Sequence, residues 1–282
     1  VTPHGGLPEV VSDLDPGLVL PGDTLEILAG VVTDVLLGIR SLPHSAACRR
    51  YVRERFDWPV VADATGAVYR SGHLSSRIPM SPRVLFVDHT AQLGGAELSM
   101  LEIAKALSSS SRVVLFEDGP FRHRLEAAGV PTTVLPAPGQ LNGVRRDGSV
   151  LAALRSIPGL VQQAARLTSV ARDYDVLLAN SQKSMLVGAL AGRLARRPVI
   201  WYCRDLMSAD HLGALQRTVA GWAARWLIDA VIANSHATKD ALAAIGGRPD
   251  QITVVHNGID AATFDAVTPD EIDAVRAELR LP

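Results

Sequence analysis

The residues best suited to chemistry follow short apolar stretches at four places in the chain. These polar groups are Asp88, His89 and Thr90; Asn180, Ser181, Gln182 and Lys183; Arg204 and Asp205; and Asn234 and Ser235. If the apolar stretches are parallel strands, all four groups lie along one edge of a sheet, where open α/β folds bind their ligands. Lys183 and Arg204 could hold a phosphate or an anionic acceptor there, whereas Arg204 could equally pair with Asp205 or another carboxylate. Four polar groups on one edge favour a binding cleft over ordinary polar loops.

A further candidate is the segment HTAQLGGAE at 89–97, between an expected strand and an expected helix. Gly94 and Gly95 let the backbone approach a ligand closely, and the helix start offers free N–H groups and partial positive charge to a phosphate. Glu97 lies in the first helical turn, where it could line the site or simply complement the helix dipole. The spacing is not that of a GxGxxG dinucleotide fingerprint, which disfavours a dehydrogenase. A plain tight turn is the alternative to a phosphate site.

A parallel sheet is needed to bring these groups together, and the pattern of the chain predicts one. Short apolar runs alternate with helical patterns, which is typical of βαβ units. We expect one doubly wound α/β domain over about 80–264. Its six expected strands are at 83–89, 112–118, 175–181, 198–205, 230–235 and 251–257, with the segment 131–137 between the second and third of them.

Two features of the expected helices bear on the domain's surface. The long helix that follows a polar loop at 139–149 is expected to break at Pro158. A later helix at 212–228 carries Trp222 and Trp226 four positions apart. That pair could rest on a membrane surface or on a partner, but packing of both rings in the core is the favoured interpretation.

The first 72 residues do not continue the alternation of strands and helices. They show a turn at 4–6, a helix start at 8–11, a strand-like run at 17–20, and helical patterns at 25–37, 48–56 and 60–70. This is too little apolar sequence for an independent sheet. Residues 73–82 contain three serines and two prolines and are expected to form a linker before the sheet domain.

Composition and charge exclude several classes of protein. The formal net charge is −1, so nothing indicates nucleic-acid binding, which needs a basic excess. Cys48 and Cys203 lie far apart and the eight histidines show no metal-ligand spacing, so neither a disulfide framework nor a metal site is expected. A cytoplasmic location fits. No apolar run reaches the roughly 18 residues of a membrane span, while a peripheral membrane contact on the cytoplasmic face stays open.

Three segments carry a resemblance to a known family. The segments VLFVDHTAQLGGAELSMLEIAKAL (84–107), WYCRDLM (201–207) and DAVIANSHATKDALAAIGGRPDQITVVHNGIDAATF (229–264) resemble the N-terminal domain of family 4 glycosyltransferases, which have the GT-B fold. The resemblance covers 80–282 continuously. It implies an acceptor-binding, Rossmann-like lobe over 83–264 and the start of the crossing to a second domain at 265–282.

The beginning of the chain resembles a different part of the same family. Residues 1–23 are similar to the C-terminal, donor-binding domain, and 49–70 to the closing helices of such an enzyme. This implies a partial second lobe at 1–72, in the order of a tandem or gene-junction fragment rather than a circular permutant. None of the nine glutamates stands eight positions from another, so the family's E-x7-E donor motif is not found. We therefore expect the chain alone to be inactive.

The resemblance implies transfer of a sugar from a nucleotide-sugar to the hydroxyl of a carbohydrate or glycolipid acceptor, with retained configuration and without metal or cofactor. The implied donor or phosphate residues are Gly5, Gly6, Glu9, Gly94 and Gly95. The implied acceptor residues are Glu97, Asn180, Lys183, Arg204 and Asp205, and the implied interdomain turn contains Asn257, Gly258 and Asp260. No catalytic acid or base is assigned, because many members have a histidine where this chain has Asn180 and Ser181.

Two other hypotheses compete with a transferase. The chain could be a non-catalytic acceptor-binding or partner module completed by another chain. A GT-B epimerase or phosphorylase relative is disfavoured, because it would need the same missing donor core. The interpretation also predicts that the helix at 60–70 contacts the 80–264 domain, and an independent sheet within the first seventy residues would contradict it.

Overall fold

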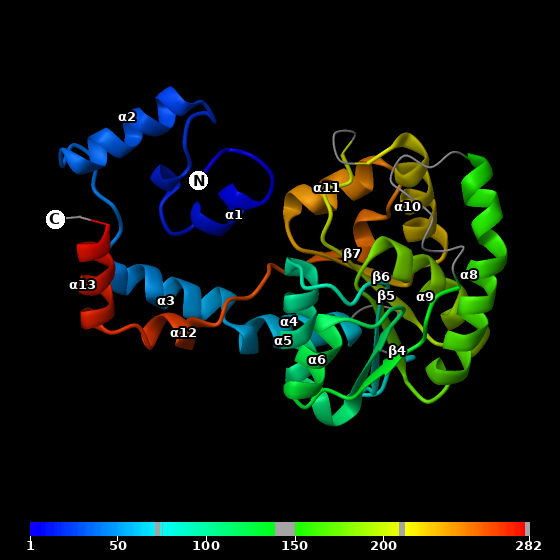
Figure 1. The fold of residues 1–282 in the computed structure, drawn as a ribbon. Coiled ribbons are helices and arrows are strands. Elements are labelled where there is room, and N and C mark those ends of the chain that lie inside the picture. Colours follow the sequence, from blue (N-terminus) through cyan, green and yellow to red (C-terminus); the bar gives the residue numbers. More distant parts are fainter. Residues whose placement is uncertain (71–73, 75, 139–149, 209–211, 280–282) are drawn as a thin grey trace.

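The computed structural model describes residues 1–70, 74, 76–138, 150–208 and 212–279, so the loop expected at 139–149 lies outside the described residues. Seven parallel strands form one sheet in the order β3-β2-β1-β4-β5-β6-β7 (Figure 1). They are β1 (Val84–Asp88), β2 (Ser111–Leu115), β3 (Thr132–Val134), β4 (Val176–Ala179), β5 (Val199–Cys203), β6 (Ala230–Ala233) and β7 (Ile252–Val254). The expected count of six strands is wrong, because the short run at 132–134 pairs with β2 as an edge strand.

Helices cover both faces of the sheet, which explains why its central strands are continuous apolar runs. Side chains of α8 (Val150–Ala171), α9 (Gln182–Ala195), α10 (Ala214–Trp226) and α11 (His236–Ala244) form a core on one face. Side chains of α5 (Gly95–Ala106), α6 (Pro120–Ala127) and α4 (Trp58–Tyr69) form the core on the other face. The expected doubly wound α/β domain is confirmed. Its strand order reverses between β1 and β4, the place where such sheets open a ligand crevice.

Two helical expectations are wrong for physical reasons. Helix α8 continues through Pro158, because burial of Ala164, Leu167 and Ala171 offsets a cost of about 3 kcal/mol for an interior proline. Trp222 and Trp226 on α10 are 54% and 58% exposed rather than packed in the core.

The tryptophans lie outside because α10 approaches its neighbour too closely to bury a large ring. Its buried face consists of Ala220, Gly221, Ala223 and Ala224. A Cβ atom on Gly221 would lie 1.9 Å from the carbonyl oxygen of Ile245. Only small side chains fit this contact, so the rings of the same helix point to solvent.

The first seventy residues form helices and the segments between them, and in Figure 1 the part before α4 lies to one side of the sheet. The elements are α1 (Leu7–Val11), η1 (Pro16–Leu18), α2 (Leu25–Leu36), α3 (Ser45–Phe56) and α4. The strand-like run at 17–20 is instead a 3₁₀ turn, because the Asp15 side chain accepts a hydrogen bond from Gly17 N. Within residues 1–70 the backbone forms no strand beyond a single bridge between Asp57 and Ile259. An independent sheet is therefore not present there.

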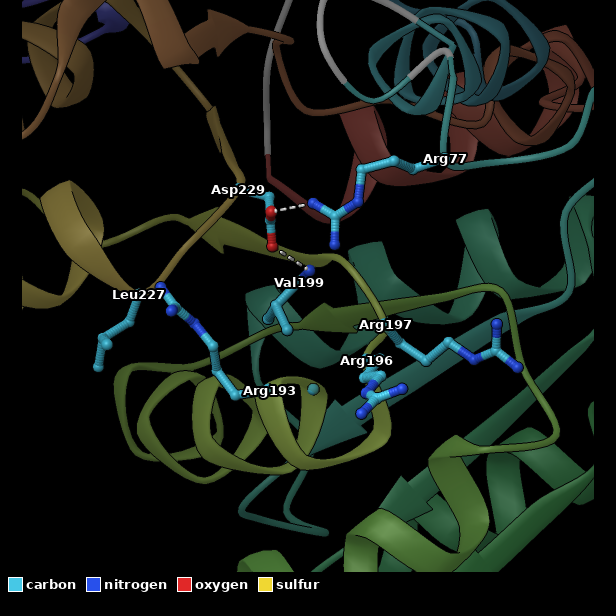
Figure 2. A pocket seen from close by; sticks show the side chains of 8 residues that line it. Arg77, Arg193, Arg196, Arg197, Val199, Leu227 and Asp229 are labelled. Atoms are coloured by element: carbon cyan, nitrogen blue, oxygen red, sulfur yellow. Dashed lines mark hydrogen bonds and ion pairs between the residues drawn. The ribbon is translucent and has the colours of Figure 1, made fainter.

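The last of these helices joins the sheet domain, as predicted. Val61, Val68 and Tyr69 of α4 are buried in one cluster with Val84 and Phe86 of β1. The following segment is also anchored, because Leu74 is 1% and Ile78 6% exposed. At the amino edge of the sheet Arg77 pairs with Asp229, whose other carboxylate oxygen accepts a hydrogen bond from Val199 N (Figure 2).

The chain leaves the sheet through two short helices, α12 (Ala261–Asp265) and α13 (Pro269–Glu278). Helix α12 lies beside α3, where Asp265 pairs with Arg53 and with Arg49. Helices α2 and α13 stand apart from the sheet in Figure 1. None of the described helices is long and apolar enough to cross a membrane.

Candidate functional site

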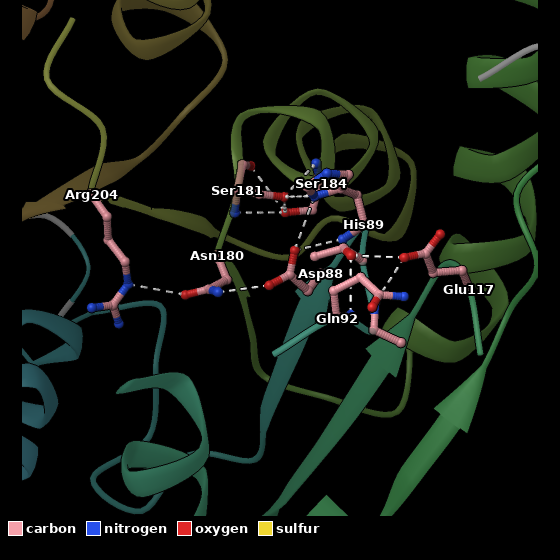
Figure 3. Close-up of polar contacts among 10 residues, drawn as sticks. Asp88, His89, Gln92, Glu117, Asn180, Ser181, Ser184 and Arg204 are labelled. Atoms are coloured by element: carbon pink, nitrogen blue, oxygen red, sulfur yellow. Dashed lines mark hydrogen bonds and ion pairs between the residues drawn. The ribbon is translucent and has the colours of Figure 1, made fainter. Parts of the chain in front are cut away.

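A buried polar network occupies the carboxyl edge of the sheet at the point where the strand order reverses (Figure 3). Asp88 ends β1 and is fully buried. Its Oδ2 accepts a hydrogen bond of 2.6 Å from Asn180 Nδ2, and Asn180 Oδ1 accepts one of 3.2 Å from Arg204 Nε. Because these residues follow β1, β4 and β5, the expected gathering of polar groups on one edge is confirmed for them.

Arg204 is the most constrained member of this network. Its guanidinium carbon lies 3.7 Å from the centre of the Tyr202 ring, and its Nη1 donates a 2.7 Å hydrogen bond to Asn257 Oδ1. Burial lowers the pKa of Arg204, but a guanidinium stays charged in proteins. The Nη2 atom is buried, and no described residue bonds it. Among the described residues Arg204 forms no ion pair within 4 Å with Asp205 or another carboxylate, although the charges of Asp88 and Glu97 act on it.

His89, which follows β1, places its imidazole ring beside Ser181, which follows Asn180 at the end of β4. Its Nδ1 lies 2.7 Å from Ser181 Oγ and 3.2 Å from Asp88 Oδ1. The ring is about one-third exposed. Sequence reasoning noted His89 but gave it no role. The register could have revealed it, because Val87 pairs with Ala179 and the residues that follow each strand must therefore be neighbours.

Glu97 lies in the first turn of α5 and is 8% exposed. Burial raises the pKa of its carboxyl group, and the charge of Asp88 raises it further. A carboxyl group with a raised pKa at the carboxyl edge of a parallel sheet is a candidate for proton exchange or for hydrogen bonding to a hydroxyl. Simple complementation of the helix dipole would not require this burial.

The two glycines before Glu97 have different surroundings. Gly94 is the N-cap of α5, and a Cβ atom there would lie 2.5 Å from Glu97 Oε2. A Cβ atom on Gly95 would meet nothing within 4 Å. The helix start is therefore open at Gly95, as a phosphate site requires, and the roles of both glycines in binding stay predictions.

The residues expected on the donor side lie against the start of α11 instead of facing open space. Glu9 accepts backbone hydrogen bonds from His236 N at 2.7 Å and Ala237 N at 2.9 Å, and its Oε2 lies 3.2 Å from His256 Nε2. Burial alone would raise the pKa of Glu9, but these hydrogen bonds outweigh it and lower the pKa. Gly6 lies so close that a Cβ atom would be 2.5 Å from Ser235 Cβ, while Gly5 adopts a left-handed φ of 61° in the preceding turn.

The remaining predicted residues separate into two groups. Lys183 and Asp205 are exposed near the network without joining it through their side chains. Asn257 joins it through Arg204, whereas Gly258 packs against Trp58 and Asp260 caps α12 through Ala262 N. The contribution of Trp58 was missed, because nothing in the sequence indicates which turn a helix some 200 residues earlier will cover.

A second set of contacts fixes the loop between β1 and α5. Glu117 Oε1 accepts hydrogen bonds from Thr90 Oγ1 at 2.7 Å and Ala91 N at 3.0 Å (Figure 3). The loop is therefore tied to the end of β2. Within the described part of the chain, no group of three His, Cys, Asp or Glu residues is arranged to hold a metal ion.

Solved structures with similar folds include HepE of Anabaena. In its complex with UDP and glucose it is 32% identical to this chain, with a TM-score of 0.59, and the match covers 70% of this chain and 50% of HepE. Its complex with UDP-glucose gives the same identity and coverage, with a TM-score of 0.58. A putative UDP-N-acetylglucosamine 2-epimerase of Listeria monocytogenes is 16% identical, over 66% of this chain and 48% of the epimerase, with a TM-score of 0.45 that is too low to bear on function.

The chain thus spans about half the length of the HepE structures it matches. Comparison with curated protein sequences gives no match. The sequence model described as Glycosyltransferase Family 4 matches residues 93–263, which include α5, Asn180, Arg204 and the turn at 257–260, whereas Asp88 and His89 of the edge network precede the match. The resemblance of the sheet domain to this family is confirmed, and the chain belongs to glycosyltransferase family 4.

Proposed function

We propose that this chain supplies the acceptor lobe of a glycosyltransferase that moves a sugar from a nucleotide-sugar to an acceptor hydroxyl with retained configuration. The observation that carries the proposal is the Arg204–Asn180–Asp88 network beside the open start of α5. It places fixed positive charge and hydrogen-bonding groups at one edge of the sheet. HepE, which shares 32% identity, was crystallised with UDP and with glucose.

The residues at this edge of the sheet have different proposed roles, which follow from their chemistry. The N–H groups at the start of α5 and the Arg204 guanidinium favour the negative charge that develops on a departing nucleoside diphosphate. Burial and the charge of Asp88 raise the pKa of Glu97, and its carboxyl group can form a hydrogen bond with an acceptor hydroxyl. The buried Asp88 carboxylate orients Asn180 and His89 through hydrogen bonds. Lys183 and Asp205 stand at the exposed rim, where they can contact a carbohydrate or glycolipid acceptor.

We also propose that residues 1–72 form a partial second lobe, with 73–82 as linker and 265–282 as the start of the crossing between lobes. Helix α2 supports this, because Leu25, Leu28, Val32 and Leu36 are all at least 46% exposed. An apolar helix face of this size is ordinarily covered by other protein. Gly6 and Glu9 already contact the sheet domain at α11, so donor-side residues would approach the site from there. A cytoplasmic location agrees with two free cysteines, Cys48 and Cys203.

Calorimetric titration of the chain with UDP-glucose and with GDP-sugars tests the proposal. Binding in the micromolar range is expected for one of them. Gly95→Ala should weaken it at least tenfold with unchanged stability, because the added methyl group meets only open space where the phosphate would lie. The matched control is Gly30→Ala on α2, which also meets nothing within 4 Å.

Titrations without heat would favour the competing function, a non-catalytic module that is completed by another chain. If Gly95→Ala leaves donor binding unchanged, the start of α5 is not part of the donor site, although the chain still binds the donor. The two results are distinguishable, because the first contradicts donor binding itself and the second contradicts only the position proposed for the donor site.

A further inference from the structure

A pocket lies at the amino edge of the sheet, opposite the proposed transfer site. It has a volume of about 350 Å³ and is lined by the C-terminal end of α9, the starts of β5 and β6, and Arg77 (Figure 2). Its charged lining residues are Arg77, Arg193, Arg196, Arg197 and Asp229. Since the strands are parallel, this edge is separated from the crevice by the length of the sheet, and the pocket cannot belong to the same site.

The positive charge of this pocket is only partly neutralised by carboxylates. Asp229 pairs with Arg77 at 2.6 Å, and its second oxygen accepts from Val199 N at 2.9 Å. Within the described chain, Arg193, Arg196 and Arg197 form no ion pair closer than 4 Å. Four arginines and one carboxylate therefore line the cavity, and this excess of positive charge favours the binding of an anion.

Two of these arginines have structural contacts that leave donors available. Arg193 donates to the Trp226 carbonyl at the end of α10, and Arg197 donates to Arg172 O at 2.9 Å just beyond α8. Both contacts complement helix C-termini. Each guanidinium has five N–H donors, and Arg197 Nε is buried with no partner among the described residues. Capping of the helices thus accounts for only part of the donor set.

Arg196 occupies a position that ordinarily favours another residue. It follows α9 with φ 58°, the only left-handed φ of a non-glycine residue in the described segments. Glycine or asparagine is usual at such a helix end, because the left-handed conformation costs a larger side chain about 1 kcal/mol. Contact of this exposed arginine with an anion at the mouth of the basic pocket would offset that cost.

An exposed aromatic stripe adjoins the pocket. Leu215, Trp222 and Trp226 lie on one side of α10, and Leu194 is 55% exposed at the end of α9. Arg225 lies 5.3 Å from the centre of the Trp226 ring. Trp226 also connects the stripe to the pocket, because its carbonyl oxygen accepts the hydrogen bond from Arg193. Tryptophan beside arginine is the pairing that membrane interfaces favour, since the ring enters the headgroup layer and the cation meets phosphate.

We propose that the pocket binds the phosphoryl headgroup of an anionic phospholipid, with Trp222 and Trp226 inserted beside it. The amino edge of the sheet would then rest on a bilayer surface, while the transfer crevice opens on the opposite side. The inference does not depend on the proposed sugar transfer. It commits to a bilayer rather than a soluble phosphate because of the exposed tryptophans, and it deepens the peripheral membrane contact that the sequence leaves open.

Co-sedimentation with vesicles tests the proposal. Vesicles containing phosphatidylglycerol should bind the chain at 0.1 M salt, and pure phosphatidylcholine vesicles should bind it at least tenfold more weakly. Each arginine near an anionic surface is worth about fivefold in affinity, so Arg196→Gln should lose about that factor. Trp222→Ser should also weaken binding without affecting the fold, because the ring is 54% exposed. The matched control is Arg124→Gln, which removes the same charge from exposed α6 on the other face of the sheet.

Three outcomes would overturn the proposal. The first is equal binding to both kinds of vesicle. The second is an equal loss for Arg196→Gln and Arg124→Gln, which would reduce the effect to net charge. The third is a thermal shift with inorganic pyrophosphate that Arg196→Gln abolishes while no vesicle binds, which would assign the pocket to a soluble phosphoryl ligand. Donor titrations at the crevice stay unaffected in all three cases, so failure here is separable from failure of the proposed function.

Discussion

Gly258→Ala tests how the first part of the chain is attached to the turn at 257–260. A Cβ atom on Gly258 would lie 2.4, 2.6 and 2.8 Å from three ring carbons of Trp58, the first residue of α4. The Trp58 ring must move by roughly 1 Å to restore ordinary contacts. Its freedom to move is small, because Ile259 N donates a 2.7 Å hydrogen bond to Phe56 O.

Overpacking of this kind costs about 1–3 kcal/mol. In a chain of this size each kcal/mol lowers Tm by about 2–4 °C, so a decrease of several degrees is expected in a thermal melt. Gly30→Ala is the control, because it adds the same atoms to α2 where nothing lies within 4 Å. It should leave Tm unchanged or raise it slightly, since alanine is the better helix former.

A double-mutant cycle identifies the cause of the loss. Trp58→Ala removes the ring that the new methyl group would strike, so adding Gly258→Ala to that background should cost little. If Gly258→Ala costs as much there as in the parent chain, the clash is not the cause, and the described docking of α4 on the turn is refuted.

Three further predictions concern buried polar groups. Asn180→Leu removes the side-chain donor to the fully buried Asp88 carboxylate and should lower the free energy of unfolding by about 1–3 kcal/mol in urea titrations; an unchanged midpoint would contradict the network. Hydrogen bonds lower the pKa of the Glu9 carboxyl group. The contact of Glu9 with the start of α11 therefore stabilises the fold at pH values above the ordinary glutamate pKa, and this stabilisation is lost as the pH falls through the lowered pKa. Proteolysis of the N-terminal segment should therefore accelerate at acidic pH, and Glu9→Gln should be cleaved at one rate across that range. Burial raises the pKa of the Cys203 thiol, so iodoacetamide should modify the half-buried Cys48 first; equal labelling by mass spectrometry would contradict the burial.

The alternation of apolar runs and helices was enough to predict the sheet domain, because a parallel sheet buries both of its faces and leaves a strong pattern. The edge on which the polar groups meet followed from the same topology. The short strand β3 was missed, since three residues with partly buried side chains carry little apolar signal. His89 was placed on this edge but its contact with Ser181 was missed, because that contact depends on the register between β1 and β4 rather than on either strand alone.

The tryptophans of α10 show a different limit of sequence reasoning. Hydropathy and spacing favour burial of Trp222 and Trp226, but burial is decided by how closely two backbones approach. Gly221 lies against the carbonyl of Ile245, and this contact selects the small residues of α10 for the core. The sequence contains the run of Ala and Gly around 220–224. Only the position of the neighbouring segment shows that these small residues form the buried face of the helix.

Two contacts of the first seventy residues with the sheet domain show from which edge of the sheet these residues approach it. Glu9 binds backbone N–H groups just after β6, and Trp58 covers a glycine just after β7. Both positions follow the carboxyl ends of strands, so the first seventy residues approach the sheet from the edge that carries Asp88, Asn180 and Arg204. A segment docked anywhere else could not contribute to a ligand in that crevice. Because Asn257 links Arg204 to the turn that Trp58 covers, a change in this docking should also alter the position of the site's buried cation.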